Sequence, residues 1–139
     1  WNYTTTQPAA DWFSPDFNAA AWSEGPSGFG TSDTPGSVVH TTWKTDDLWL
    51  RREISLSSDQ LKNAQAWFYH DDDAEVYING VLAIKAPGWT TGYELFPLLP
   101  AAQAALKPGP NLVAIHCHQD HGGQFVDLGF VKVEPAAKK

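Results

Sequence analysis

The stretch from His70 to Gly80, HDDDAEVYING, determines how the rest of the chain is interpreted. Its last two residues, Asn79 and Gly80, are the strongest short-range signal for a β-hairpin, because both central positions of a two-residue type I′ turn need positive φ. Apolar residues alternate with others on both sides of the turn, from Val76 to Ala83, as in strands with one buried face. The stretch therefore predicts two antiparallel strands joined by a tight turn.

Three successive aspartates, Asp71, Asp72 and Asp73, precede this hairpin. One interpretation is a solvated turn in which the carboxylates cap backbone groups. The other is a ligand or cation site, in which hard carboxylate oxygens suit calcium, although the spacing is not that of an EF-hand loop. The sequence requires no cofactor, and a structural calcium ion is the option that this corner leaves open.

Length and composition indicate one β-sandwich domain over residues 1–139. Seven Trp, seven Phe and four Tyr, with many Pro and Gly and little helical periodicity, are typical of such a sandwich with long loops. Besides the hairpin, antiparallel strands are expected at LWLRREISL, AWFYH, LVAIHCHQ and QFVDLGFVKV. One short helix is expected at residues 101–106, and Cys117 is expected to be a small buried core residue.

The charge of the chain excludes some classes of partner. Its formal net charge is -7, and only nine Lys and Arg are spread along it, whereas phosphate binding needs clustered cations. No apolar run approaches the length of a membrane span. We therefore expect neither a nucleic acid nor a membrane as partner. Because the chain starts abruptly at Trp1, we expect a mature or excised piece of a longer protein.

Strand parity predicts which loops share one end of the sandwich. If every strand crosses the whole sandwich, the loops near residues 40–47, 71–73, 87–92 and 119–123 lie together, opposite the Asn79-Gly80 turn. The rim that they form gathers Trp43, Lys44, Asp46, Asp47, His70, Asp71, Asp72, Asp73, Trp89, His118, Gln119, Asp120, His121 and Gln124. The turn near residues 107–111 is expected at the far end.

A histidine-rich strand end supplies a second candidate site. Alternation places His116 and His118 on one strand face, a spacing that two imidazoles can use to bind one ion. The candidate metal ligands are Asp71, Asp73, His116, His118 and His121. Because Leu112 and Ala114 share that face, we favour a structural cluster inside the sandwich, hydrogen-bonded to His70 or to an aspartate.

The quoted motifs resemble a known family. The runs DAEVYING at residues 73–80 and GPNLVAI at residues 109–115, with the spacing from Phe17 to Trp22, look like the galactose-binding-like jelly-roll domain. That domain is related to the sugar-binding domain of family 2 glycoside hydrolases, and the resemblance covers nearly the whole chain. It implies a jelly-roll β-sandwich, an accessory module of a secreted bacterial protein, in the extracellular space or periplasm, that binds carbohydrate or packs beside a catalytic domain.

Catalysis by this domain is not expected. Glycoside hydrolysis needs two carboxylates that face each other across a sugar, and three adjacent loop aspartates do not provide that separation. The chain has no Gly-x-Ser-x-Gly elbow and no phosphate-binding loop. We expect a non-catalytic carbohydrate-binding module of a larger carbohydrate-active protein. The alternative is a structural domain that packs on a neighbouring catalytic domain without binding sugar.

A sugar site needs an aromatic platform and several fixed donors and acceptors. Trp89 is the predicted platform, with Trp43 as the second. The predicted carbohydrate-binding residues are Trp89, Asp71, Asp72, Trp43, His118, Gln119 and Gln124. A sheet face around Trp49 or Trp67 is the alternative location.

Overall fold

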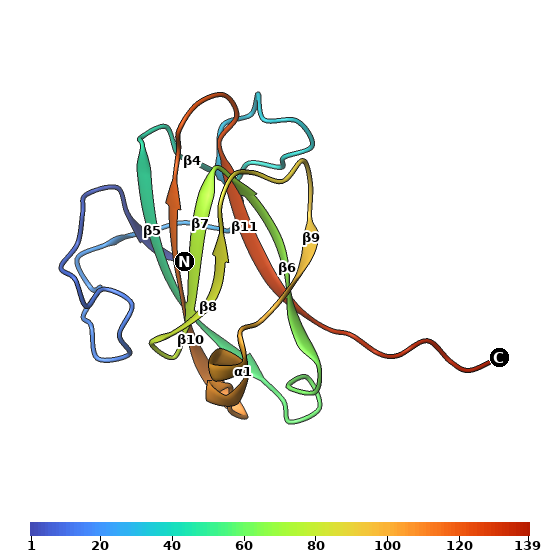
Figure 1. Ribbon diagram of the computed structural model, residues 1–139. Coiled ribbons are helices and arrows are strands. Elements are labelled where there is room, and N and C mark those ends of the chain that lie inside the picture. Colours follow the sequence, from blue (N-terminus) through green and yellow to red (C-terminus); the bar gives the residue numbers. More distant parts are fainter.

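Two β-sheets pack face to face in the computed structural model, which describes residues 1–139 (Figure 1). The six-stranded sheet has the order β2 (Ser23–Glu24), β1 (Asn2–Thr4), β5 (Asp47–Leu56), β10 (Gly109–His118), β7 (Asp73–Ile78) and β8 (Val81–Ala86). The five-stranded sheet has the order β4 (Thr41–Thr42), β3 (Phe29–Gly30), β11 (Phe125–Lys132), β6 (Ala64–Asp71) and β9 (Glu94–Pro97). All strand pairs are antiparallel except β3 with β4.

One short helix, α1 (Pro100–Ala105), follows β9. The prediction of an antiparallel all-β sandwich with one short helix is therefore confirmed, with the helix shifted by one residue at each end. The structure contains no helix with the length and apolar character needed to cross a membrane.

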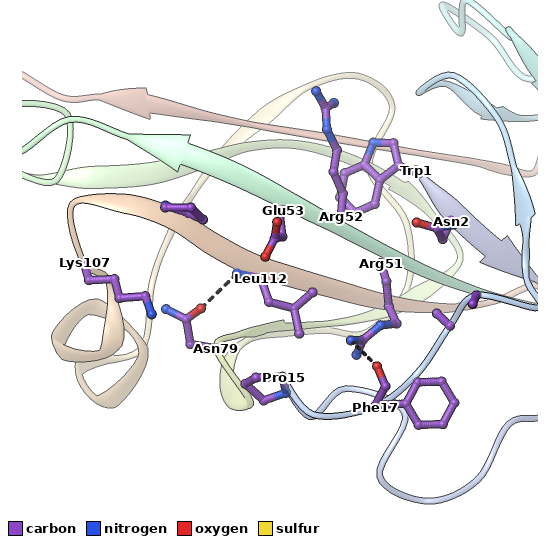
Figure 2. A pocket seen from close by; sticks show the side chains of 13 residues that line it. Trp1, Asn2, Pro15, Phe17, Arg51, Arg52, Glu53, Asn79, Lys107 and Leu112 are labelled. Atoms are coloured by element: carbon purple, nitrogen blue, oxygen red, sulfur yellow. Dashed lines mark hydrogen bonds between the residues drawn. The ribbon is translucent and has the colours of Figure 1, made fainter.

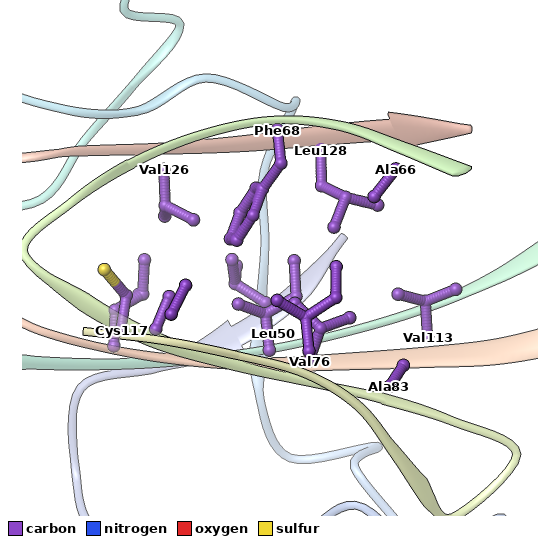
Figure 3. Packing of buried hydrophobic residues seen from close by; sticks show 14 of the residues in the cluster. Leu50, Ala66, Phe68, Val76, Ala83, Val113, Cys117, Val126 and Leu128 are labelled. Atoms are coloured by element: carbon purple, nitrogen blue, oxygen red, sulfur yellow. The ribbon is translucent and has the colours of Figure 1, made fainter. Parts of the chain in front are cut away.

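The core lies between the two sheets, where the inward-facing side chains of the long strands meet (Figure 3). Phe68 from β6 and Val126 from β11 face Leu50 and Val76 from the six-stranded sheet, and all four are at most 1% exposed. Alternation along each strand explains this arrangement, because every second side chain points to the same face. Cys117 is fully buried in this core, as predicted, and burial raises the pKa of its thiol.

The predicted hairpin turn is confirmed and lies at the end of the sandwich that also holds α1 (Figure 1). Asn79 has φ of 50° and Gly80 of 82°, and Ile78 pairs directly with Val81, as a two-residue type I′ turn requires. The Asn79 side chain accepts a hydrogen bond from the Leu112 amide at 2.9 Å. This contact joins the hairpin to the start of β10, so both turns share the far end as predicted.

Replacing Gly80 by valine is expected to lower the free energy of unfolding by about 1 to 3 kcal/mol, because a β-branched residue is strained at positive φ. The added Cβ would also lie 3.1 Å from Cδ of Pro15. Gly129→Val is the matched control, since that position has open space and is in a strand. Urea unfolding measures both variants. A loss below about 0.5 kcal/mol for Gly80→Val would contradict the prediction.

Candidate functional site

The loops that strand parity grouped together do meet at one end of the sandwich. Asp72 Oδ2 accepts hydrogen bonds from the backbone N–H of Asp120 at 2.8 Å and of His121 at 3.2 Å, which joins the β6–β7 corner to the β10–β11 loop. The Gln124 amide donates to the Thr45 carbonyl at 2.6 Å, which joins the same loop to the segment before β5. The predicted meeting of these loops at one end is therefore confirmed, although the side chains of the predicted rim do not all face one surface.

A small cavity of about 210 Å³ opens on this rim. It is lined by Asp71, Asp72, Trp89, His121, Gly122 and Gly123. Trp89 is 61% exposed, whereas Asp71 is only 8% and Asp72 only 4% exposed. A β-bridge between Trp89 and Asp71 fixes the indole-bearing loop beside the carboxyl groups. The cavity thus combines an exposed aromatic face with two buried acidic groups.

The two carboxyl groups in the cavity influence each other. Burial, and then the hydrogen bond with Asp72 and its negative charge, raise the pKa of Asp71 to about 7, while the nearby His121 opposes this shift. Asp72 is held by the two backbone N–H groups of the β10–β11 loop. This raised pKa distinguishes Asp71 from an ordinary surface aspartate.

Two residues predicted to bind sugar are buried and do not line the cavity. Trp43 is 2% exposed and packs in the core, where its indole N–H donates to Thr45 Oγ1 at 3.1 Å. It cannot offer a ring face to a ligand, so its assignment as a second platform is wrong. Gln124 is 6% exposed, and its amide N–H is used by a backbone carbonyl. Strand parity places a residue at the rim but does not determine whether its side chain points inward.

The predicted histidine pair lies on the outer face of the six-stranded sheet. His116 Nε2 and His118 Nδ1 contact the same oxygen, Asp47 Oδ1, at 2.8 and 2.9 Å. The His116 ring stacks on Trp49 with 4.8 Å between ring centroids and 8° between planes. The expected hydrogen bond to an aspartate is confirmed, but the expected position inside the sandwich is wrong. His118 therefore belongs to a different surface from the Trp89 cavity.

The other candidate residues of the rim, Gln119, Asp73 and His121, each contact a different group. Gln119 donates through its side chain to the Gly122 carbonyl at 3.2 Å, and its Oε1 is buried without a partner. Asp73 accepts a hydrogen bond from the Gly88 amide, and the His121 ring lies 3.2 Å from Asp120. No group of three or more His, Cys, Asp or Glu side chains is arranged to bind a metal ion.

Replacing Asp47 by asparagine is expected to lower the pKa of His118 toward its ordinary value of about 6.5. The hydrogen bond to Asp47 raises the pKa of His118. Partial burial alone would raise the pKa of Asp47, but hydrogen bonds from His118 and His116 outweigh it and lower that pKa. The ion pair thus stabilises the fold between these two pKa values, and the effect disappears as the pH falls through the lower one or rises through the higher one.

An NMR titration of the histidine ring protons measures this shift. Asp46→Asn is the matched control, because Asp46 is exposed and only adds a weaker charge effect on His118. An unchanged His118 titration in Asp47→Asn would show that the contact is not formed in solution.

The sequence interpretation missed two glycines that shape the cavity. Gly122 and Gly123 line it, and a Cβ built on Gly123 would lie 2.8 Å from Asp71 Oδ2. Glycine at this position therefore leaves one oxygen of Asp71 open to the cavity. Two successive glycines in the loop between β10 and β11 were the signal that could have indicated this close approach.

A larger hollow, of about 620 Å³, lies away from the rim (Figure 2). It lies between the N-terminal segment and the outer face of the six-stranded sheet, and Arg51, Phe17 and Lys107 are among its lining residues. The Arg51 guanidinium points to the N-terminal segment and donates to the Phe17 carbonyl at 3.1 Å. This hollow is therefore a seam between the segment and the sheet, and the rim cavity is the better candidate for ligand binding.

Comparisons with known proteins identify the fold. No protein-family model and no curated protein matches the chain. Among solved structures, a β-glucuronidase from glycoside hydrolase family 2 matches with a TM-score of 0.60 and 20% identity, over 88% of this chain and 13% of that one. A β-glucuronidase from Bacteroides uniformis matches with a TM-score of 0.60 and 18% identity, over 94% and 17%. A β-glycosidase from Bacteroides vulgatus matches with a TM-score of 0.55 and 19% identity, over 94% and 19%.

The chain spans less than a fifth of each of these three enzymes. At such identities the similarity is one of fold. The chain therefore has the fold of one β-sandwich domain of these glycosidases, as the sequence motifs predicted.

Proposed function

We propose that this domain is a non-catalytic carbohydrate-binding module of a larger, secreted carbohydrate-active protein, and that the sugar binds at the cavity beside Trp89. The observation that carries the proposal is the pairing of a 61% exposed indole with two nearly buried carboxyl groups in one small cavity. A sugar ring presents an apolar C–H face to an aromatic side chain and hydroxyl groups to acceptors such as carboxylates. The fold supports the proposal, because similar domains occur within the longer chains of glycosidases.

The acidic pair does not suit hydrolysis of a glycosidic bond. The two carboxyl groups of Asp71 and Asp72 are hydrogen-bonded neighbours, and both residues line the cavity. In retaining and inverting glycosidases the two carboxyl groups flank the bond, at separations of about 5 to 9.5 Å. The cavity therefore favours binding over cleavage, and catalysis would be the task of a neighbouring domain.

A glycan array followed by titration calorimetry tests the proposal. Trp89→Ala is expected to weaken binding of the best array ligand about tenfold or more, since stacking on an aromatic face contributes about 1 to 3 kcal/mol. Trp67→Ala is the matched control, because Trp67 is also exposed, at 42%, but lies on the outer face of the five-stranded sheet.

Two other outcomes of these binding measurements would contradict the proposal. If Trp67→Ala weakens binding and Trp89→Ala does not, the ligand lies on the sheet face instead. If the parent domain binds no glycan, the proposal is wrong and a structural role beside a catalytic domain takes its place.

A further inference from the structure

The acidic pair in the cavity beside Trp89 forms no ion pair within the protein. Of the six residues that line the cavity, two are aspartates and none is Lys or Arg. The ion pairs of the protein are formed by other acidic residues, namely Asp47, Asp59, Glu75, Asp120 and Glu134. Buried carboxylates are normally paired or hydrogen-bonded, because removing a charge from water has a large free-energy cost. The cavity is therefore suited to a ligand that brings positive charge.

Asp71 is the cavity residue whose carboxyl group has no donor other than its acidic neighbour. Asp72 Oδ2 accepts two backbone hydrogen bonds. In contrast, no N–H or hydroxyl group of the protein donates to the Asp71 carboxyl, whose polar neighbour is the carboxyl of Asp72. Asp71 is nevertheless 92% buried, given its 8% exposure. Because Gly123 has no side chain, Asp71 Oδ2 is left open on the cavity side. A group with several N–H donors would satisfy it.

We propose that this cavity receives the ammonium group of an amino sugar, with Asp71 and Asp72 as its acceptors and Trp89 covering the sugar ring. This inference rests on the proposed function and specifies the chemical class of its ligand. The face of an indole attracts cations as well as C–H groups, so the platform and the acidic pair favour the same ligand. The raised pKa of Asp71 agrees with this geometry, because the ammonium takes the place of the proton that the acidic pair holds without ligand.

An ammonium group fits the cavity better than a metal ion or a neutral hydroxyl group does. Calcium takes six to eight oxygen ligands, and the structure contains no cluster of three or more acidic, His or Cys side chains arranged to bind an ion. A neutral hydroxyl group could occupy the same position, but the negative charge of the acidic pair would then stay unpaired.

The experiment compares two oligosaccharides of glucosamine that differ only in N-acetylation. Both offer the same ring face to Trp89, but acetylation removes the positive charge. Titration calorimetry at about pH 6.5, below the ordinary pKa of an aliphatic amine, is run with chelator and at several salt concentrations. The free amine is expected to bind about tenfold more tightly than the acetylated form, the scale of one additional charge-assisted hydrogen bond.

Variants separate the specific site from general attraction to an acidic protein. Asp71→Asn is expected to abolish the preference for the free amine, while Asp120→Asn, which removes one charge from an exposed neighbouring side chain, keeps it. Gly123→Ala provides a second variant, because its methyl group would lie 2.8 Å from Asp71 Oδ2, so that the carboxyl group must shift, and the preference is expected to be lost in the same way. Thermal melting confirms that each variant is folded.

The outcomes distinguish this inference from the function on which it rests. Equal affinity for the two oligosaccharides, with both weakened by Trp89→Ala, overturns the ammonium inference and leaves carbohydrate binding intact. Loss of the preference in Asp120→Asn as strongly as in Asp71→Asn also overturns it, as does binding that requires added calcium. If no oligosaccharide or array glycan binds, the proposed function itself is wrong.

Discussion

Trp43→Ala is expected to lower the free energy of unfolding by about 3 to 5 kcal/mol, the cost typical of removing a large aromatic side chain from a packed core. Trp43 is 2% exposed and belongs to the main hydrophobic cluster between the sheets. Its backbone N–H also donates to the Gly30 carbonyl at 3.0 Å, which connects the segment before β5 to β3. The cavity left by the indole would lie where this segment enters the core.

Trp89→Ala is the matched control for this prediction, because its indole is 61% exposed and its removal leaves no core cavity. Urea unfolding of the two variants is expected to show a large loss for Trp43→Ala and a change within about 0.5 kcal/mol for Trp89→Ala. The ligand-binding results should show the reverse order. A small stability loss for Trp43→Ala would mean that this tryptophan is not part of the core.

Arg51→Ala is expected to lower the free energy of unfolding by about 3 to 5 kcal/mol, because it removes a buried charged donor and leaves several carbonyls unsatisfied. The Arg51 guanidinium donates to the carbonyl oxygens of Trp12 at 2.5 Å, Ser14 at 2.9 Å and Phe17 at 3.1 Å. Its central carbon also lies 5.3 Å from the centre of the Phe17 ring. One side chain thus holds the irregular N-terminal segment against the outer face of the six-stranded sheet.

Arg52→Ala is the control, since the neighbouring arginine is exposed and a surface substitution usually changes stability by less than about 0.5 kcal/mol. Urea unfolding gives the magnitudes, and hydrogen exchange shows where the structure is loosened. We expect faster exchange around residues 12–17 in Arg51→Ala, with β7 and β10 still protected. Equal losses in the two variants would contradict the anchoring role of Arg51.

Much of the fold could be predicted from the sequence, because its signals are local. The type I′ turn needs only the conformational freedom of Asn79 and Gly80, and the alternation of apolar residues identifies the long strands. Strand parity then predicted correctly that the β6–β7 corner, the Trp89 loop and the β10–β11 loop meet at one rim. Strand parity depends only on how often the chain crosses the sandwich and not on side-chain packing, so this prediction of loop position was correct.

The site could be predicted only in part, because burial is a property of the whole fold. Trp43 and Trp89 both occur in loops of the same rim, yet one fills the core and the other is open to solvent. Arg51 lies on the outer face of β5, but that face is covered by the N-terminal segment, and the arginine is 6% exposed. No local pattern indicates which face a distant segment will cover.

By itself, the sequence determined the hairpin, the sandwich class, the loops of the rim and the acidic corner with Trp89 beside it. Only the tertiary structure decided that Asp71 is buried without a donor, that Gly123 leaves it open to the cavity, and that the histidine pair lies on the outer face with Asp47. The physical reason is the range of the interactions. Turn conformation and strand alternation depend on neighbours in the chain, whereas desolvation of a carboxyl group depends on every segment that packs around it.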